Sequence, residues 1–188
     1  MSSTVNKSLR TWFSKLKDDD ENVRKRAKRA LRSLNPNDRH AVPELIGFLN
    51  SGDTIFRFWA ARAVSHIGPK AKDAVPSLIK SLATDDPDCQ FWVVMALAAI
   101  GSAAKKAIPL LIDLLQDPEF VIRQTVAVAL MRIDPTAKSV VPALVTTLES
   151  DENSFVRQEV VRALGRIGTP PAVTALIATL TDRNSDVR

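Results

Sequence analysis

The chain has 188 residues, of which 45% are hydrophobic and 25% are charged, a composition typical of an ordinary soluble protein of about one domain. A single cysteine excludes an internal disulfide, and no apolar run approaches the ~18 residues that would predict a membrane span. The formal net charge is +5, but residues 1–40 carry +6 and the remaining residues carry −1, so the basic character belongs to one end of the sequence.

Residues 1–40 predict an N-terminal capping repeat. One apolar stripe runs along its first segment, formed by Val5, Leu9, Trp12, Phe13 and Leu16. Four acidic residues at 18–21 then precede a basic helix, as expected where negative charge favours a helix N-terminus. The outward positions of that helix are all basic: Lys25, Lys28, Arg29 and Arg32. They form a candidate patch for an anionic partner, although a charged face on an end repeat is also compatible with simple solvation.

From residue 41 onward the sequence repeats itself. Pro43, Pro76, Pro109 and Pro142 are each separated by 33 residues. A fixed period of this length predicts a solenoid, in which each unit buries its apolar face against its neighbours. We therefore divide the chain into full repeats at 41–73, 74–106, 107–139 and 140–171, followed by an incomplete repeat at 172–188, all within one domain spanning 1–188.

Each unit predicts two helices. The first begins at a Val-Pro pair, because proline is tolerated in the first turn, where the N–H groups have no partner within the helix. The second begins near an Asp-Pro pair such as Asp86-Pro87 or Asp117-Pro118, where the aspartate can cap the helix. Glycine then ends the second helix at Gly68, Gly101 and Gly168, since a left-handed cap favours glycine.

The repeated motif is Asp-x-x-Val-Arg-x-x-Ala-x-x-Ala-Leu-x-x-Ile-Gly followed by Ala-Val-Pro-x-Leu-Ile. It resembles HEAT repeats, and more closely their short bacterial form, the bilin-lyase-type repeats. From the repeat pattern and this resemblance, we expect an all-α, right-handed α-solenoid (superhelix) of about eleven helices. The resemblance also implies a ladder of Asp and Arg between repeats, for which Arg24, Arg57, Arg123 and Arg157 share one slot. The residues four positions earlier are Asp20, Asp53, Glu119 and Asn153, and an acid at this spacing could alternatively pair with its arginine inside the same helix. Gln90 interrupts that slot in the third unit.

The outward positions of the second helices differ strongly from unit to unit. In a solenoid these helices commonly line the concave surface. The candidate partner-binding residues on this surface are Phe58, Trp59, Arg62, Phe91, Trp92, Met95, Val128, Met131 and Arg162. Phe, Trp, Met and Arg are enriched in interface cores, which favours a groove for a peptide or helix. The aromatic residues could instead pack across the seam between repeats, and both interpretations remain open.

The sequence carries few signs of catalysis. His40 and His66 are 26 residues apart, and there is neither a Cys-x-x-Cys pair nor a glycine-rich phosphate loop. We expect a non-catalytic, cytoplasmic protein-interaction scaffold with no cofactor and no metal, and with Cys89 in the core. Two alternatives remain: a bilin-lyase-like protein that handles tetrapyrroles, and a nucleic-acid-binding protein acting through the basic N-terminal repeat.

The C-terminal end predicts an unfinished repeat. Ala172 to Leu180 forms a first helix, but residues 186–188 look like the beginning of a second helix that does not continue. We expect the apolar face of the last helix to lack a covering partner at Val173, Leu176, Ile177 and Leu180. An exposed apolar face of this kind could support end-to-end self-association or fray from residue 182.

Overall fold

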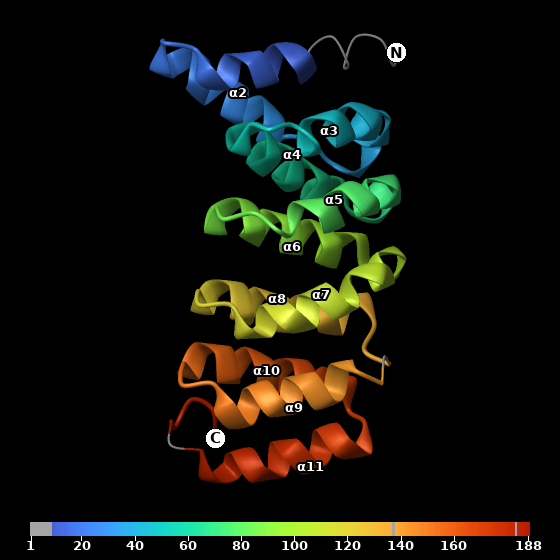
Figure 1. The fold of residues 1–188 in the computed structure, drawn as a ribbon, viewed down its shortest axis with the longest axis vertical. Helices are drawn as coiled ribbons and strands as arrows, with labels where there is room; N and C mark the ends of the chain where they lie inside the picture. Colours follow the sequence, from blue (N-terminus) through green and yellow to red (C-terminus); the bar gives the residue numbers. More distant parts are fainter. Residues whose placement is uncertain (1–8, 137, 183) are drawn as a thin grey trace. The chain divides into compact units, whose positions relative to one another are not determined.

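A computed structural model describes residues 9–136, 138–182 and 184–188 of the protein (Figure 1). Within these residues all regular secondary structure is helical, which confirms the predicted all-α repeat fold. The chain forms two compact units, residues 1–103 and 104–188. The first eight residues of the predicted capping repeat, Val5 among them, lie outside the described residues.

The first unit consists of paired helices joined by short 3₁₀ turns. After helical residues 9–14, its elements are η1 (Lys15–Lys17), α2 (Glu21–Arg32), η2 (Pro36–Ala41), α3 (Val42–Leu49), α4 (Thr54–Ile67), η3 (Gly68–Ala74), α5 (Val75–Ser81) and α6 (Pro87–Ile100), followed by η4 (Gly101–Ala107). Helix α3 packs on α4 and α5 packs on α6, and the two second helices α4 and α6 pack directly against each other. Each pair therefore covers the apolar face of the next, as the repeat pattern predicted.

The second unit follows the same plan. Its elements are α7 (Ile108–Asp113), η5 (Leu114–Gln116), α8 (Phe120–Ile133), α9 (Val140–Ser150), α10 (Ser154–Ile167), α11 (Pro170–Ala178) and η6 (Thr179–Thr181). Helices α7 and α9 pack on α8 and α10 respectively, and α8 packs against α10. The small residues Ala129 and Ala163 are buried in α8 and α10, which allows the close approach expected of packed helices.

The predicted helix starts are confirmed. Helices α3, α5, α7 and α9 each begin at the first residue of the Val-Pro or Ile-Pro pair, or one residue before it. Second helices begin after a capping side chain that accepts a backbone N–H bond, as Asp53 does from Ile55 at 3.0 Å and Asp86 does from Cys89 at 2.8 Å. Such caps satisfy N–H groups that have no partner within the helix.

The prediction that Asp117 caps the following helix is wrong. Helix α8 begins later, at Phe120, with Glu119 at the N-cap position and without a side-chain cap bond. Counting 33 residues from Asp86 leads to Glu119, so the Asp117-Pro118 pair lies two residues ahead of the repeat slot. Asp117 instead accepts the backbone N–H of Glu119 at 2.9 Å and stabilises the turn before the helix.

Glycine ends the second helices as predicted, with positive φ at Gly68, Gly101 and Gly168. Gly68 and Gly101 share φ near +70° and ψ of −136°, a conformation that side chains with a Cβ rarely adopt. Gly168 is in the ordinary left-handed region, with φ of 63° and ψ of 14°. In the intervening repeat, helix α8 ends at Asp134 without a positive φ.

Helix α11 exposes much of its apolar surface. Val173, Ile177 and Leu180 are 46%, 63% and 64% exposed, and Leu176 is half-buried. The residues after it do not fray within the described part, because Val187 is 3% exposed and Arg188 donates to the Asp182 carbonyl at 2.9 Å. The exposed face follows the sequence-based expectation, whereas the end of the chain packs back on its own unit.

One helical stretch, Pro87–Gln116, is long and apolar enough by composition to cross a membrane. Half of its most apolar window is buried inside the protein. Gly101 also interrupts it with a positive φ, so two separate helices, α6 and α7, share the stretch. The apolar composition of this stretch is explained by core packing.

Candidate binding face

The predicted partner-binding residues of the first unit lie on α4 and α6, and the basic patch lies on α2, which contacts α4. Trp59 is only 5% exposed, so it contributes one edge of its ring to the surface. The other predicted residues on these two helices are half-buried: Phe58, Arg62, Phe91, Trp92 and Met95. The four residues of the basic patch are exposed: Lys25, Lys28, Arg29 and Arg32.

Arginine and tryptophan side chains alternate across these three helices. The Arg32 guanidinium lies 5.4 Å from the Trp59 ring centre, and the Arg62 guanidinium lies 5.5 Å from the same ring. Arg62 also stacks over Trp92 at 4.4 Å. A cation over an indole ring is attracted by the negative ring face, which restrains both side chains. We call these four residues, with the flanking Phe58, Phe91 and Met95, the Arg–Trp face.

Aromatic contacts fix the position of Trp92. Phe58 from the preceding repeat and Phe91 from the same helix meet its ring edge-on at 6.3 Å and 5.2 Å between ring centres. His66 also contacts Trp92, and its Nδ1 lies 3.1 Å from the Arg32 carbonyl, which ties α4 to the end of α2. The aromatic residues therefore pack between repeats and still keep part of their surface exposed. The sequence offered no signal for the role of His66.

Arg62 is the unusual charge of this face. Burial of its guanidinium, followed by the positive charge of Arg32, lowers the pKa of Arg62. Its Nε is buried and has no hydrogen-bond acceptor. Among the described residues no carboxylate pairs with Arg29, Arg32 or Arg62, whereas Lys25 pairs with Glu21 at 2.8 Å. The face thus holds guanidinium N–H donors that no acid of this unit neutralises, an arrangement suited to a carboxylate or phosphate.

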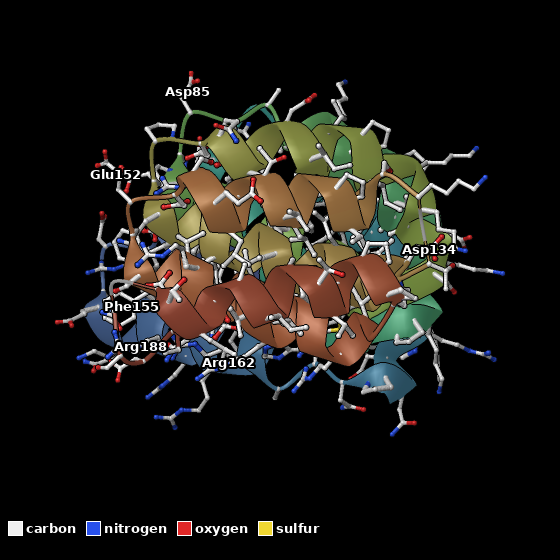
Figure 2. The ribbon with its side chains drawn as sticks, turned by 90° about the horizontal axis from the view of Figure 1, so that it is seen from below. Asp85, Asp134, Glu152, Phe155, Arg162 and Arg188 are labelled. Carbon is white, nitrogen blue, oxygen red and sulfur yellow. The ribbon has the colours of Figure 1, made fainter. Side chains whose placement is uncertain are left out.

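The remaining predicted residues belong to the second unit and are arranged differently. Val128 and Met131 on α8 are half-buried. Arg162 on α10 is exposed, lies on the outside of the unit in Figure 2, and forms an ion pair with Glu159. Because Arg162 is neutralised within its own helix, the described part of this unit presents no counterpart of the stacked arginines.

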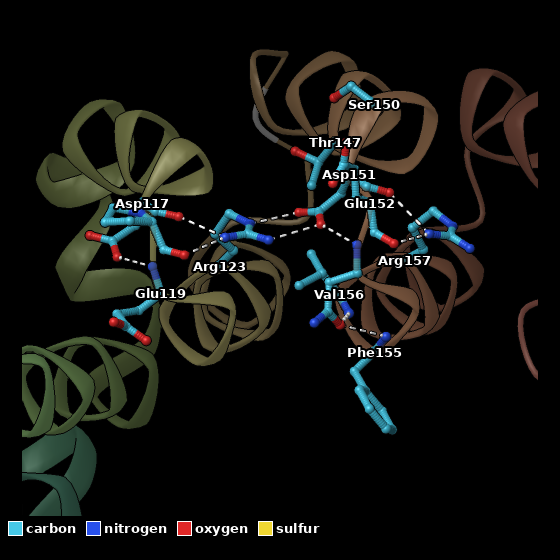
Figure 3. Close-up of polar contacts among 12 residues, drawn as sticks. Asp117, Glu119, Arg123, Thr147, Ser150, Asp151, Glu152, Phe155, Val156 and Arg157 are labelled. Atoms are coloured by element: carbon cyan, nitrogen blue, oxygen red, sulfur yellow. Dashed lines mark hydrogen bonds and ion pairs between the residues drawn. The ribbon is translucent and has the colours of Figure 1, made fainter.

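In the second unit, the arginines at the shared repeat position form a ladder of ion pairs with acidic residues of the next repeat (Figure 3). Arg123 donates through Nε and Nη2 to both oxygens of Asp151 at 2.7 and 2.9 Å. Arg157 binds Asp182 in the same bidentate way, with both distances 2.9 Å. Each arginine also donates through Nη1 to two backbone carbonyls of the loop before its helix. The ladder between repeats is therefore confirmed for these two arginines, and no pairing of Arg123 with Glu119 is found. Arg24 and Arg57 instead donate within their own repeats, Arg24 to the carbonyls of Asp18 and Asp19 and Arg57 to the Ser51 carbonyl and Thr54 Oγ1.

A family model described as HEAT repeats matches residues 9–98, 75–139 and 108–188, which together cover nearly all of the sequence. The chain belongs to the HEAT-repeat family. Among curated proteins, none matches it.

Solved structures of repeat proteins share this HEAT-repeat fold. An engineered protein aligns with a TM-score of 0.66 and 25% identity, over 96% of this chain and 92% of its own. A designed armadillo repeat protein in complex with the peptide (KR)4 aligns with a TM-score of 0.67 and 18% identity, over 95% and 94%. The complex of CpcE and CpcF of phycocyanin lyase from Nostoc sp. PCC7120 aligns with a TM-score of 0.64 and 22% identity, over 83% and 97%. At 18% and 22% identity these last two likenesses concern the fold alone.

Within this HEAT array, the third unit departs from the ladder for a structural reason. Gln90 replaces the arginine and donates through Nε2 to the Leu82 carbonyl at 3.1 Å, so it takes over the loop contact without a charge. The neighbouring Cys89 is fully buried, as predicted for a core residue, and burial raises the pKa of its thiol.

The described residues hold no cluster of three or more side chains able to bind a metal. The two histidines are held in unrelated ways, His66 against Trp92 and His40 in η2 before α3.

Proposed function

We propose that this HEAT-repeat protein is a non-catalytic, cytoplasmic scaffold that binds an acidic peptide segment of a partner protein on the Arg–Trp face. The single observation that carries the proposal is Arg62, held between Trp59 and Trp92 with its Nε–H lacking an acceptor. An arginine restrained by stacking loses little freedom on binding, so its hydrogen bonds contribute more fully to affinity.

The ladder of the second unit supports a carboxylate as the ligand. Arg123 and Arg157 both bind a carboxylate through the Nε and Nη2 edge. Arg62 has no partner acid among the described residues, so a carboxylate of a bound peptide would supply the counter-charge that Arg123 and Arg157 each receive from within the chain. Exposed Lys28, Arg29 and Arg32 would attract further acidic residues of the same peptide.

Charge also distinguishes this face from that of a designed neighbour. The armadillo repeat protein mentioned above was solved with the basic peptide (KR)4. The Arg–Trp face is itself basic, so the complementary partner is acidic. Partly exposed Phe58, Phe91 and Met95 provide apolar contacts beside the charges, as is typical of interface cores.

Nucleic acid is a less suitable ligand for this face. Single-stranded nucleic acid is commonly bound by stacking bases on aromatic rings. Here the protein's own guanidinium groups already lie over Trp59 and Trp92. The tetrapyrrole alternative is supported only by likeness of fold, and we do not propose it.

Binding of a labelled peptide rich in Asp and Glu, with one or two aromatic residues, tests the proposal. Arg62→Met keeps the length of the stem but removes the donors, and we expect a loss of affinity of about ten-fold or more, since hydrogen bonds to charged groups contribute about 1.5–3 kcal/mol. Lys72→Met, which removes an exposed charge on η3, is the matched control and should change affinity little. Tighter binding of (KR)4, or of an oligonucleotide of equal length, would reject the acidic-peptide proposal.

A second contact is proposed at the other end of the chain. The exposed apolar side chains of α11 and of η6 after it form a surface suited to association with another copy of the chain: Val173, Ile177 and Leu180. This self-association is independent of the Arg–Trp face, because it involves the second unit alone.

A further inference from the structure

A hollow of about 580 Å³ lies in the first unit, between the N-terminal helical residues and the α3–α4 hairpin. Its walls include Arg10 and Ser14 from the N-terminal segment, Glu44, Gly47 and Phe48 from α3, and Phe56 from α4. None of these residues belongs to the Arg–Trp face. A volume of this size accommodates a small organic molecule or one long side chain.

Glu44 is the charged group of this hollow. Its side chain is only 9% exposed, and Oε1 accepts from Arg10 Nε at 2.5 Å. The second oxygen, Oε2, is buried and has no hydrogen-bond partner. Arg10 itself is 82% exposed, so the cation that pairs with Glu44 among the described residues lies mostly in water. A buried carboxylate oxygen without a donor is unfavourable, and a donor brought by a ligand would relieve it.

The apolar part of the hollow comes from Phe48 and Phe56, which pack with the fully buried Phe13. Phe48 stacks on Phe13 with ring centres 3.6 Å apart, and Phe56 meets both rings edge-on. The ammonium group of Lys17 lies 5.4 Å from the Phe56 ring centre, so these rings already attract one cation of the chain. Aromatic rings next to a buried carboxylate form an environment that favours a positive charge carried on an apolar stem.

Gly47 keeps the hollow open. It lies inside α3, where glycine is less favourable than alanine by about 0.5–1 kcal/mol. Its φ is not positive, and a Cβ built on it would meet nothing within 4 Å, so neither backbone conformation nor crowding requires glycine here. The equivalent positions of the next three repeats carry side chains, Lys80, Asp113 and Thr146. The absence of a side chain at 47 leaves space in the wall of the hollow.

We infer that this hollow binds an organic cation, an alkylammonium or guanidinium group on an apolar stem. The cation pairs with the carboxylate of Glu44, and its stem lies against Phe48 and Phe56 over Gly47. Two sources share this chemistry: a free amine, and a Lys or Arg side chain of a bound peptide. The inference does not depend on the proposed function, because it uses different residues and a ligand of the opposite charge.

The test compares two probes of similar shape and opposite charge, 2-phenylethylammonium and 3-phenylpropionate, by NMR titration of the full chain. We expect saturable binding of the ammonium probe and none of the carboxylate probe. Nα-acetyl-lysine methylamide measures how well a peptide side chain fits. If it binds more tightly than the free amine, the source is a peptide, and if it binds more weakly, the source is a free amine.

Four variants assign binding to the hollow. Glu44→Gln should reduce the affinity for the ammonium probe about ten-fold or more, because the substitution removes the negative charge but keeps the size of the side chain. Gly47→Leu should abolish binding by filling the space, whereas Gly47→Ala, which improves the helix and adds little volume, should retain it. Arg10→Ala should leave binding unchanged or stronger, because it removes a competing cation. The inference is overturned by preference for the carboxylate probe, by full binding in Gly47→Leu, by loss of binding in Arg10→Ala, or by no saturable binding of either probe.

Discussion

Replacing Asp182 by Asn tests how much the Arg ladder stabilises the second unit. The Arg157 side chain is 4% exposed and that of Asp182 is 12% exposed, so this ion pair is nearly buried. Removing one partner of a buried pair leaves an uncompensated charge and costs roughly 3–5 kcal/mol. Asparagine keeps one acceptor for Arg157, and the two carbonyl bonds to Nη1 remain, so we expect the lower end, about 3 kcal/mol.

Denaturant unfolding followed by two probes gives the measurement. Trp12, Trp59 and Trp92 all lie in the first unit, so their fluorescence reports on that unit, while far-UV circular dichroism reports on all helices. Asp182→Asn should shift the circular dichroism transition more than the fluorescence transition. Addition of Arg157→Met should recover part of the loss, because it removes the uncompensated charge.

Asp186→Asn is the matched control for this experiment. Asp186 is exposed and lies four residues further along the same unit, so its substitution should change stability by less than about 0.5 kcal/mol. An equal effect of the two substitutions would contradict the view that the ladder stabilises the stack. A loss below about 0.5 kcal/mol for Asp182→Asn would contradict it as well.

Three further predictions concern acid stability, the glycine caps and α11. Burial alone would raise the pKa of Asp151, but hydrogen bonds from Arg123 and from the Asn153 backbone outweigh burial and lower the pKa below 3.8. The resulting stabilisation is present above about pH 4 and is lost as the pH falls through the pKa of the folded state. The stability of wild type and of Arg123→Met, measured during acid titration, should therefore differ in this pH range. In thermal unfolding, Gly68→Ala should destabilise the protein by about 1–3 kcal/mol and Gly168→Ala by only about 1 kcal/mol. Equal effects would refute the view that the backbone conformation of Gly68 is the less favourable one for a residue with a Cβ. Ile177→Glu should reduce concentration-dependent association in sedimentation experiments, and a wild-type protein that stays monomeric at high concentration would rule this contact out.

Much of the fold could be predicted from the period alone. The spacing of Pro43, Pro76 and Pro109 located the starts of the first helices, and the glycines located the ends of most second helices. The error at Asp117 arose because an Asp-Pro pair was matched by type rather than by its position in the repeat. Likewise, an acid four residues before an arginine suggested pairing within the helix, but the guanidinium reaches the next repeat because a bidentate acid is available there.

The candidate face was less predictable. Helical projection indicated which side chains lie opposite the core, but not that Trp59 would be nearly covered, since this depends on Arg32 from another repeat. The sequence could not assign Arg62 to a stacked position either, because stacking depends on the distance between α4 and α6. The hollow at Glu44 was missed for a related reason. Its wall comes from the N-terminal segment, whose pattern differs from the other repeats.

The central claim is that an acidic peptide binds the Arg–Trp face, and the three tryptophans test it most directly. Their side-chain N–H groups give separate NMR signals, and Arg62 stacks on Trp59 and Trp92 but not on Trp12. During titration with the acidic peptide, the account predicts that the signals of Trp59 and Trp92 shift together while that of Trp12 stays in place. A shift of the Trp12 signal alone, or binding of the peptide that leaves Trp59 and Trp92 unchanged, would contradict it.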